Sequence, residues 1–289
     1  MADEDIVISV RGLVKSFVNE DGVRVRVLDD VNLDVRRGET LVVMGGSGCG
    51  KSTLLNCLIG EYAPDEGGIF YRTSDAAEPV NIVGMRDEDL NRIRKKFGIL
   101  FQSGALFNSM TVAENVALPL REHSYVDPSI IDIVVTLKLQ QVHLLEHRDK
   151  MPAQLSGGQK KRAGLARATA LDPEILFYDE PSAGLDPVTS AAIDNLIIDL
   201  SRKLHVTSVV VTHEMDSAFR IADRMVMLDR GRVLRIGTRD EFDALRNRRP
   251  ADLADDEERL IYQFLHGNAD GPLTDAYGLS EFEKLITEG

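Results

Sequence analysis

A nine-residue segment near the first quarter of this 289-residue chain has the spacing of a phosphate-binding loop. It reads Gly45-Gly46-Ser47-Gly48-Cys49-Gly50-Lys51-Ser52-Thr53. Glycines spaced as G-x-x-x-x-G-K-S let backbone N–H groups curl around the α- and β-phosphates of a nucleotide. In such a loop Lys51 reaches the β- and γ-phosphates and the Ser52 hydroxyl ligates Mg²⁺. The pattern therefore predicts a binding site for ATP with Mg²⁺.

A pair of acidic residues forms the second candidate site. Asp179 and Glu180 come directly after the short apolar run Ile175–Tyr178. An isolated Asp-Glu pair is most often a solvated strand end, but a carboxylate after a buried strand beside a phosphate loop is where a second Mg²⁺ ligand sits. We expect Asp179 to hold the metal through a water molecule, and Glu180 to orient or deprotonate the water that attacks the γ-phosphate.

These residues need a sheet whose strand ends lie together. Short apolar runs predict buried parallel strands at Thr40–Met44, Phe97–Phe101, Ile175–Tyr178 and Ser208–Val211. The first run leads into the glycine-rich loop, and a helix is expected after it over Thr53–Ile59. This order of strand, loop and helix directs the positive end of the helix dipole at a phosphate.

Other segments predict an antiparallel hairpin and an inserted group of helices. The hairpin lies between Ile6 and Val35, with its turn at Asp21-Gly22. The helical segment covers roughly residues 103–153. Within it Asp127-Pro128 predicts a helix start, because proline favours the first helical position. We expect the next residues of this helix to form a mostly apolar face, namely Ile130, Ile131, Val134, Val135 and Leu137.

The family is indicated by a second glycine-containing motif. Leu155-Ser156-Gly157-Gly158-Gln159 precedes a helical run, Ala163–Ala170. In this motif the chain resembles ABC ATPases, whose signature is the string LSGGQ. Its free N–H groups at a helix start are suited to bind phosphate. The resemblance implies a head-to-tail dimer, in which Ser156, Gly157, Gly158 and Gln159 cover the γ-phosphate on the phosphate loop of a second copy.

The resemblance extends over about 200 residues and assigns further roles. It implies that Gln102 senses Mg²⁺ and the γ-phosphate, that Asp186 belongs to the loop contacting the partner's nucleotide, and that His213 contacts the γ-phosphate. Phe17 lies where the family stacks an aromatic ring on adenine, although a core phenylalanine in a strand is an equally good interpretation.

The implied fold is α/β, with a P-loop NTPase core of RecA-like type built on a mainly parallel sheet. An antiparallel β subdomain at the N-terminus, a helical subdomain near residues 103–158 and a C-terminal helical extension complete it. We expect an ATPase domain over residues 1–245 and an extension over 246–289. The extension contains an apolar stripe at Leu260, Ile261, Phe264 and Leu265, and Ser280 with Glu283 has capping-box spacing. The stripe either crosses the dimer, as in relatives, or packs on its own domain.

Segments outside the shared motifs resemble the ATPase subunits of Mla-type phospholipid transporters, which work with MCE proteins. These segments are Phe101–Phe107, Leu118–His123 and Phe264–Pro272. The resemblance implies a membrane permease, an MCE lipid-binding protein and, in many members, a small STAS-domain protein as partners. It places the ATPase on the cytoplasmic face of the inner membrane. The alternatives are an ABC ATPase for another solute, or a non-transport ABC ATPase that signals across a membrane.

The composition excludes several other classes. The formal charge of −13 argues against a broad basic face for nucleic acid. The acidic N-terminus lacks the pattern of a secretory signal, and no stretch approaches 18 consecutive apolar residues. The two cysteines, Cys49 and Cys57, suggest neither disulfides nor a zinc site, so we expect buried thiols in a reducing cytoplasm.

Overall fold

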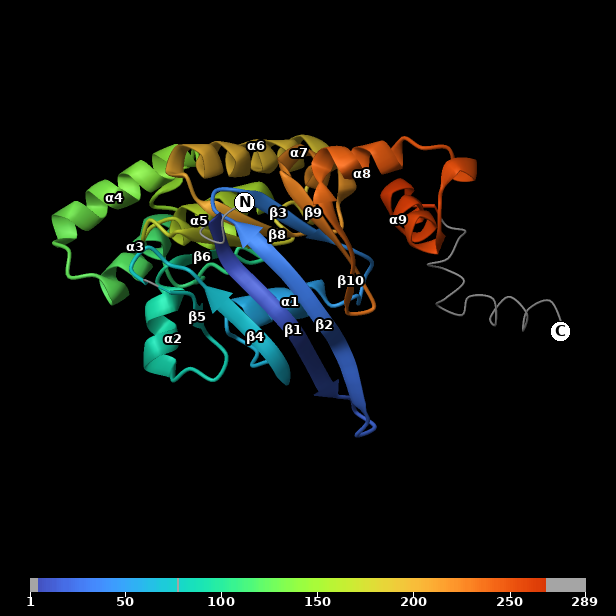
Figure 1. Cartoon of the computed structure of the whole chain (residues 1–289). Coiled ribbons are helices and arrows are strands. Elements are labelled where there is room, and N and C mark those ends of the chain that lie inside the picture. The colour runs from blue at the N-terminus through green and yellow to red at the C-terminus, as the bar shows by residue number, and fades with distance from the viewer. Residues whose placement is uncertain (1–4, 77, 269–289) are drawn as a thin grey trace.

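A six-stranded sheet forms the centre of the computed structural model, which describes residues 5–76 and 78–268 (Figure 1). The strand order is β10-β9-β3-β8-β7-β6, with β10 antiparallel to β9 and the other neighbours parallel. The strands of this sheet are β3 (Thr40–Met44), β6 (Phe97–Leu100), β7 (Ile175–Asp179), β8 (Thr207–Val211), β9 (Arg224–Asp229) and β10 (Arg232–Thr238). The parallel strands expected from the sequence are therefore confirmed, together with the α/β class.

Each parallel strand is buried on both faces because other elements cover both sides of the sheet. Successive side chains of a strand point to opposite faces. Val42 and Met44 accordingly join one hydrophobic core, while Leu41 and Val43 join the other. All five residues of β3 are buried, which explains why these strands appear in the sequence as uninterrupted apolar runs.

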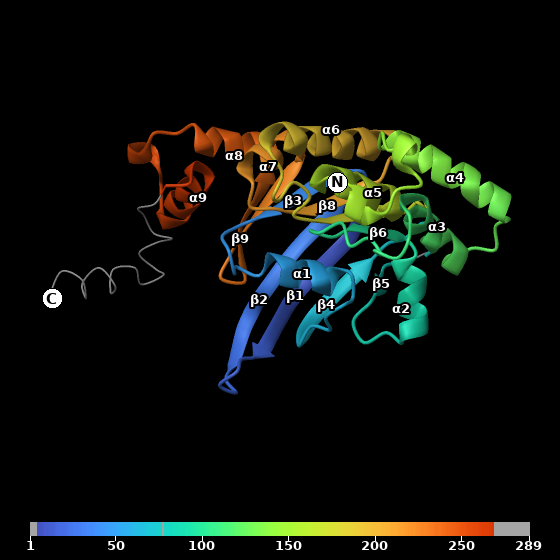
Figure 2. The same ribbon diagram turned by 180° about the vertical axis from the view of Figure 1, so that it is seen from behind.

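Helices cover one face of the sheet, and α1 with a second sheet covers the other (Figures 1 and 2). The helices α6, α7 and α8 run along the first face. The bounds of the helices are α1 (Lys51–Leu58), α2 (Asp87–Arg94), α3 (Val112–His123), α4 (Pro128–Gln141), α5 (Gly157–Ala168), α6 (Pro187–Leu204), α7 (Met215–Ile221), α8 (Arg239–Arg246) and α9 (Asp256–His266), with short 3₁₀ turns η2 (Leu145–His147), η3 (Pro152–Gln154) and η4 (Pro250–Asp252). No helix in the described ranges is long and apolar enough to cross a bilayer.

The second sheet contains the expected N-terminal hairpin. It is antiparallel, in the order β2-β1-β4-β5, and its long strands β1 (Ile6–Val18) and β2 (Arg24–Arg36) meet at a turn closed by the Gly22 N–H donating to the Asn19 carbonyl. The strands β4 (Glu66–Tyr71) and β5 (Val80–Asn81) complete it. The polar segment between these two strands, residues 73–76 and 78–79 as described, is a loop.

The helix α4 begins where the sequence predicts, but one expected face is wrong. Asp127 caps α4 by accepting the Ser129 N–H, and Pro128 occupies the first turn. Only Ile131 and Val135 of the expected apolar face are buried, whereas Ile130 and Leu137 are half exposed. In a helix of period 3.6 these two residues lie on the side away from α3 and α5, so they face solvent.

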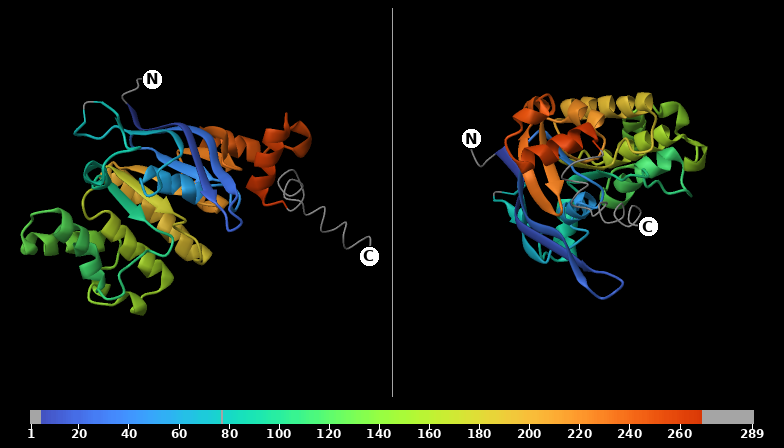
Figure 3. Two further views of the ribbon diagram at one scale, coloured as in Figure 1. Left: turned by 90° about the horizontal axis from the view of Figure 1, so that it is seen from below. Right: turned by 90° about the vertical axis from the view of Figure 1, so that its right-hand side faces the viewer.

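The C-terminal segment packs α9 at the end of the molecule opposite to α3 and α4 (Figure 3). Ile261 and Leu265 are buried in the same core as α6 to α8, and Leu260 and Phe264 pack against it. The stripe therefore packs on its own chain in this structure. The capping-box pair Ser280 and Glu283 lies outside the described residues.

A buried carboxylate anchors α9. Glu258 accepts two hydrogen bonds from Arg248, each of 2.8 Å, and one of 2.9 Å from the Ala254 N–H. The Ala254 N–H and the Arg248 guanidinium hold the pKa of Glu258 below its ordinary value. The anchor is therefore complete at neutral pH, and is lost only as the pH falls through that lowered pKa.

Replacing this carboxylate by an amide should loosen α9. In Glu258→Gln one acceptor oxygen becomes a donor that faces Arg248, so amides of residues 256–266 should exchange with deuterium faster. The control is Glu257→Gln, which alters an exposed side chain of the same helix. Hydrogen-exchange mass spectrometry measures both, and equal exchange in the two variants would contradict the anchor.

Candidate functional site

Three parallel strands bring the predicted site residues to one edge of the sheet. In the register, Val43 of β3 and Asp179 of β7 both lie opposite Val211 of β8. The chain leaves β3 for the glycine-rich loop, leaves β7 at Glu180 and leaves β8 just before His213. Ligand sites in such sheets form at the carboxyl ends of the strands, and this is where these segments meet.

The glycine-rich loop lies too close to its neighbours for side chains at two of its positions. A Cβ at Gly45 would approach the Leu228 carbonyl oxygen to 2.2 Å, and one at Gly50 would approach the Val27 carbonyl oxygen to 2.9 Å. Both glycines also have positive φ, at 154° and 108°. Gly50 caps α1, so the loop delivers the positive end of that helix to the site.

Lys51 lies across the loop rather than away from it. Its ammonium donates to the carbonyl oxygens of Gly45 and Gly46, at 2.8 and 2.9 Å. The side chain is buried, so a cation is held among the backbone groups of the loop. This arrangement is suited to bind an anion.

Asp179 provides the observation that bears on a metal. Burial raises the pKa of its carboxyl, and the charge of Glu180 adds to this, while Lys161, Ser52 and Lys51 oppose it. Its Oδ1 is buried and accepts no hydrogen bond from any described residue. A buried acceptor without a partner is costly, and a hydrated divalent cation would satisfy it. Ser52 and Asp179 therefore fit a Mg²⁺ that takes its other ligands from phosphates and water.

Glu180 is held by both its side chain and its backbone. Its carboxylate pairs with His213 Nδ1 at 2.8 Å and accepts the Thr212 hydroxyl at 3.1 Å. Its φ of 48° lies in the left-handed region, which costs of order 1 kcal/mol or more for a residue of this type. The strain is maintained because its N–H donates to the Val211 carbonyl at 2.9 Å.

Lys161 holds the carbonyl group of the same residue, Glu180, and sequence reasoning missed this lysine. Its ammonium donates to the Glu180 carbonyl oxygen at 2.8 Å and is buried. Burial lowers the pKa of Lys161, while Asp179, Glu180 and Glu214 act in the opposite sense. The residue stands five positions after the signature serine in a Lys-Lys-Arg run, and such a run ordinarily indicates a solvated face. Only the fold shows that its middle member points inward.

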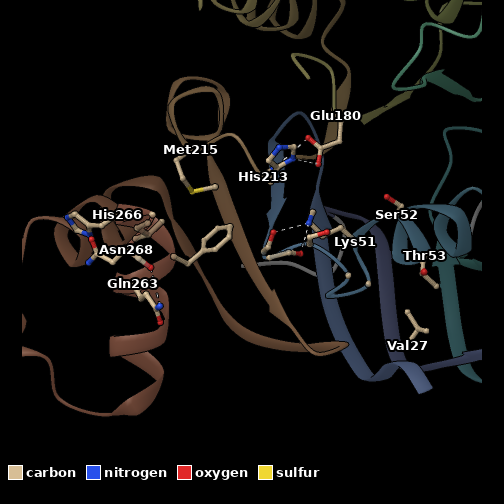
Figure 4. Close-up of a pocket in the computed structure, with 18 of the residues that line it drawn as sticks. Val27, Lys51, Ser52, Thr53, Glu180, His213, Met215, Gln263, His266 and Asn268 are labelled. Atoms are coloured by element: carbon tan, nitrogen blue, oxygen red, sulfur yellow. Dashed lines mark hydrogen bonds and ion pairs between the residues drawn. The ribbon is translucent and has the colours of Figure 1, made fainter. Parts of the chain in front are cut away.

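A cavity of about 1020 Å³ lies between the glycine-rich loop and the Glu180–His213 pair (Figure 4). One wall consists of the glycine-rich loop, Ser52, Thr53 and Val27, and Gln102, Glu180, His213 and Met215 extend it. The structure thus brings together the predicted Gln102, Glu180 and His213. The opposite wall consists of residues 263–268 at the end of α9. This contribution was also missed, since the sequence marks those residues only by their resemblance to transporter subunits.

The signature motif lies elsewhere on the surface. Ser156 caps α5 by accepting the Gln159 N–H, and the Gln159 side chain accepts the Ser156 N–H in return. Gly158 packs so closely on Thr189 that a Cβ would lie 2.5 Å from its methyl group. Asp186 caps α6 through the N–H groups of Val188 and Thr189. None of the predicted residues Ser156, Gly157, Gly158, Gln159 and Asp186 lines the cavity of this chain.

Three further predicted residues, Phe17, Cys49 and Asp179, also lie outside the lining of the cavity. Phe17 packs edge-to-face on Tyr62 with ring centroids 5.4 Å apart, and the Lys15 ammonium lies 5.1 Å from its ring centre. Phe17 as a whole remains about 38% exposed. Cys49 is buried beneath the glycine-rich loop, which leaves its backbone as the part of the residue that contributes to the loop. Asp179 ends β7 directly before the lining residue Glu180.

A second groove, of about 800 Å³, lies on the helical side of the molecule. Its lining includes Phe101, Phe107, Leu118 and His123. Two of the three segments that resemble transporter subunits, Phe101–Phe107 and Leu118–His123, thus contribute to one groove. Arg167 shapes this groove by donating to the carbonyl oxygens of Ala105 and Gly104, at 2.8 and 3.2 Å.

Comparison with known proteins identifies the family. The model of the ABC transporter family matches residues 28–183. The chain is 40% identical over 276 residues to a Mycobacterium leprae protein named "Probable ribonucleotide transport ATP-binding protein mkl", covering 96% of this chain and 72% of that protein. It is 36% identical over 275 residues to the intermembrane phospholipid transport system ATP-binding protein MlaF of Haemophilus influenzae, covering 95% and 97%. It is 37% identical to MlaF of Escherichia coli K12, covering 91% of both chains.

Solved structures agree with this assignment. A dimeric post-hydrolysis state of the ATP-binding cassette MJ0796 with ADP and Pi has a TM-score of 0.72 and 31% identity, covering 80% of this chain and 98% of that one. The cbiO1 protein of Clostridium perfringens, part of the cbiONQ transporter complex, also has a TM-score of 0.72, with 28% identity. It covers 83% of this chain and 91% of its own.

The burial of both cysteines makes them unreactive in the native state. Burial raises the pKa of the Cys57 thiol to about 11 and also raises that of Cys49, which the nearby Lys51 opposes. Because the thiolate is the reactive form, iodoacetamide at a pH of about 8 should leave both residues unmodified. After unfolding in guanidinium both should react, as intact-mass measurement would detect. Rapid labelling of the native protein would contradict the packing around the loop.

Proposed function

The chain belongs to the ABC transporter family as an ATP-hydrolysing subunit, and we propose that it drives phospholipid transport across a cell envelope. The observation that carries the catalytic part is the meeting of the glycine-rich loop, Gln102, Glu180 and His213 around one cavity. In this proposal the backbone of residues 45–53 and the Lys51 ammonium hold the phosphates of ATP. The ring of Phe17 serves as a stacking surface for adenine.

Mg²⁺ is proposed to accompany the nucleotide. Ser52, Gln102 and Asp179 are the residues that would hold it, and its charge would neutralise the β- and γ-phosphate oxygens. The buried, unpartnered Oδ1 of Asp179 supports this proposal. No group of three or more Asp, Glu, His or Cys side chains in the described part of the chain is spaced to bind a metal. This agrees with a cation whose remaining ligands are phosphate oxygens and water.

Glu180 and His213 are proposed to act on the reacting groups. The Glu180 carboxylate would accept a proton from the attacking water, and His213 at 2.8 Å would orient that carboxylate and contact the γ-phosphate. Since phosphoryl transfer needs little covalent help from the protein, most of the rate gain comes from positioning and charge stabilisation. The tethers from Thr212 and Lys161 serve this positioning.

Two copies of the chain are proposed to form the complete site. The signature residues Ser156, Gly157, Gly158 and Gln159 lie at the N-terminal end of α5, but away from the cavity of their own chain. A head-to-tail second copy would bring them, with Asp186, onto the γ-phosphate. The dimeric form of the similar cassette MJ0796 supports this arrangement.

The 800 Å³ groove is proposed to receive a cytoplasmic segment of a membrane permease. Its walls combine exposed aromatic rings, Phe101 and Phe107, with charged groups of α2 and α3. Such a mixture is typical of a protein interface. A permease bound here would hold the ATPase at the cytoplasmic face of the inner membrane.

Phospholipid is proposed as the cargo on the strength of the similarity to MlaF, which extends over 95% of this chain. In this proposal an MCE lipid-binding protein completes the transporter, and a STAS-domain protein binds the ATPase. A second candidate is transport of a ribonucleotide or another solute, which the 40% identity to mkl favours. The cargo that co-purifies with the complex would decide between them.

Replacing the proposed base should separate binding from hydrolysis. A general base contributes about 10²- to 10⁴-fold to the rate, so Glu180→Gln should bind ATP normally while its turnover falls at least about 100-fold. Lys51→Ala, in contrast, should lose affinity for ATP in addition to turnover. Fluorescent-nucleotide titration and phosphate release measure the two properties, and near-normal turnover of Glu180→Gln would refute the base assignment.

A charge placed in the groove should detach the permease. Because desolvating a charge at an interface is costly, Phe107→Glu should reduce the recovery of the permease at least about tenfold when the tagged protein is purified from detergent-solubilised membranes. Val18→Glu, on an exposed residue at the end of β1, is the control.

The same purification also tests the cargo. Mass spectrometry of the control complex should identify an MCE protein and phospholipid. Recovery of a solute permease without an MCE protein would overturn the lipid assignment, and equal recovery by both variants would overturn the groove.

A further inference from the structure

A fully buried carboxylate lies behind the catalytic edge of the sheet, outside the cavity lining. Asp194 is the eighth residue of α6 and has no exposed surface. Aspartate is almost never fully buried unless it is paired, because desolvating a charge is costly. Its contacts therefore indicate what it holds together.

Both carboxylate oxygens of Asp194 accept hydrogen bonds. Oδ1 accepts the Ser217 hydroxyl at 2.5 Å, and the Ser182 hydroxyl lies 3.4 Å from it. Oδ2 accepts Nη1 of Arg220 at 2.8 Å. The two serine hydroxyls lie 3.1 Å apart. Ser217 donates its proton to Asp194, and Ser182 has a single proton for its two neighbours, the Asp194 carboxylate and the Ser217 oxygen. Asp194, Ser182, Ser217 and Arg220 together form the Asp194 cluster.

The cluster joins the two chain segments that carry the proposed catalytic pair. Ser182 stands two residues after Glu180, in the loop that leads to α6. Ser217 stands four residues after His213, on α7. At the cavity the same two segments meet through the 2.8 Å contact between Glu180 and His213. The two segments are thus connected at the sheet edge, where Glu180 also bonds Val211 and Thr212, and again in the interior at Asp194.

The interior connection adds a constraint on position that is largely removed from water. The serines and Asp194 are buried with at most 2% exposed surface, whereas the His213 side chain is about 58% exposed. Charge-assisted hydrogen bonds removed from water are stronger and less mobile than exposed ones. The cluster therefore holds the two segments together in the interior, in addition to the pairing of β7 with β8 at the sheet edge.

We propose that Asp194 is a positioning residue for ATP hydrolysis, which fixes the loop after Glu180 against the helix after His213. This inference rests on the proposed roles of Glu180 and His213. The loop from Ser182 to Asp186 is also the segment that would face the second copy. Because Ser182 belongs to both the loop and the cluster, a displacement of the loop would also move the segments that carry Glu180 and His213.

Asp194→Asn tests the proposal because it keeps the shape and removes one acceptor. The new amide group faces either Ser217 or Arg220, so one donor loses its partner. Misplacement of catalytic groups lowers the rate without weakening phosphate contacts made by residues 45–53, so we expect kcat to fall about tenfold while KM for ATP stays within about twofold of wild type. Ser217→Ala should give a smaller fall of the same kind.

The matched control is Glu39→Gln. Glu39 is also buried and pairs with Arg224 at 2.9 Å, but it lies before β3, at the end of that strand away from the loop. Its variant should unfold at a similarly lowered temperature and keep the wild-type kcat. Thermal unfolding, kcat and KM are measured for all three variants. If Asp194→Asn does not fold, the kcat and KM of Ser217→Ala are judged by the same criterion.

The outcomes separate this inference from the proposed function. A fall in kcat for Asp194→Asn but not for Glu39→Gln supports the inference. A wild-type kcat in Asp194→Asn, or an equal fall of kcat in Asp194→Asn and Glu39→Gln, overturns the inference about Asp194. If Glu180→Gln is inactive in the same assay, the proposed function still stands. Activity in Glu180→Gln would instead remove the catalytic pair that Asp194 is proposed to position.

Discussion

The parallel hydrogen-bonded pairing of β3, β8 and β7 is the constraint on which the rest of the site depends. Parallel neighbours end at the same edge of a sheet, so the register that aligns Val43 and Asp179 with Val211 also aligns the segments that come after the three strands. The glycine-rich loop, Glu180 and His213, which are far apart in the chain, thereby come together at one cavity. A shift of one residue in this register would separate them.

Charged groups in this region are kept inside because each has a defined partner. Lys51 donates to carbonyl oxygens of its own loop, Lys161 donates to the Glu180 carbonyl, and Asp194 accepts from side chains of α7. Buried polar groups that are satisfied in this way rigidify their surroundings. Asp179 is the exception, since one of its oxygens has no partner among the described residues.

The cavity and the groove are lined by different kinds of side chain. The cavity at the strand ends collects phosphate-binding and carboxylate groups, whereas the groove near α3 collects aromatic rings and surface charges. They share a connecting segment, because Phe101 lines the groove and the adjacent Gln102 lines the cavity. The linings of the cavity and the groove are therefore joined by a single peptide bond at this point of the chain.

The sequence alone determined the N-terminal hairpin, the strands β3, β6, β7 and β8, and the positions of the glycine-rich loop and the acidic pair after two of them, because local patterns of apolar residues and glycines specify them directly. It did not mark β4, β5, β9 or β10. It did not determine that Ile130 faces solvent, that Lys161 points inward or that residues 263–268 form a wall of the cavity, since each depends on which surface a distant segment covers. The burial of Asp194 could not be read from the sequence either, because an aspartate in a helix ordinarily faces water. Only the packing of α6 against α7 and the loop at Ser182 gave it partners, and that packing is a property of the tertiary structure.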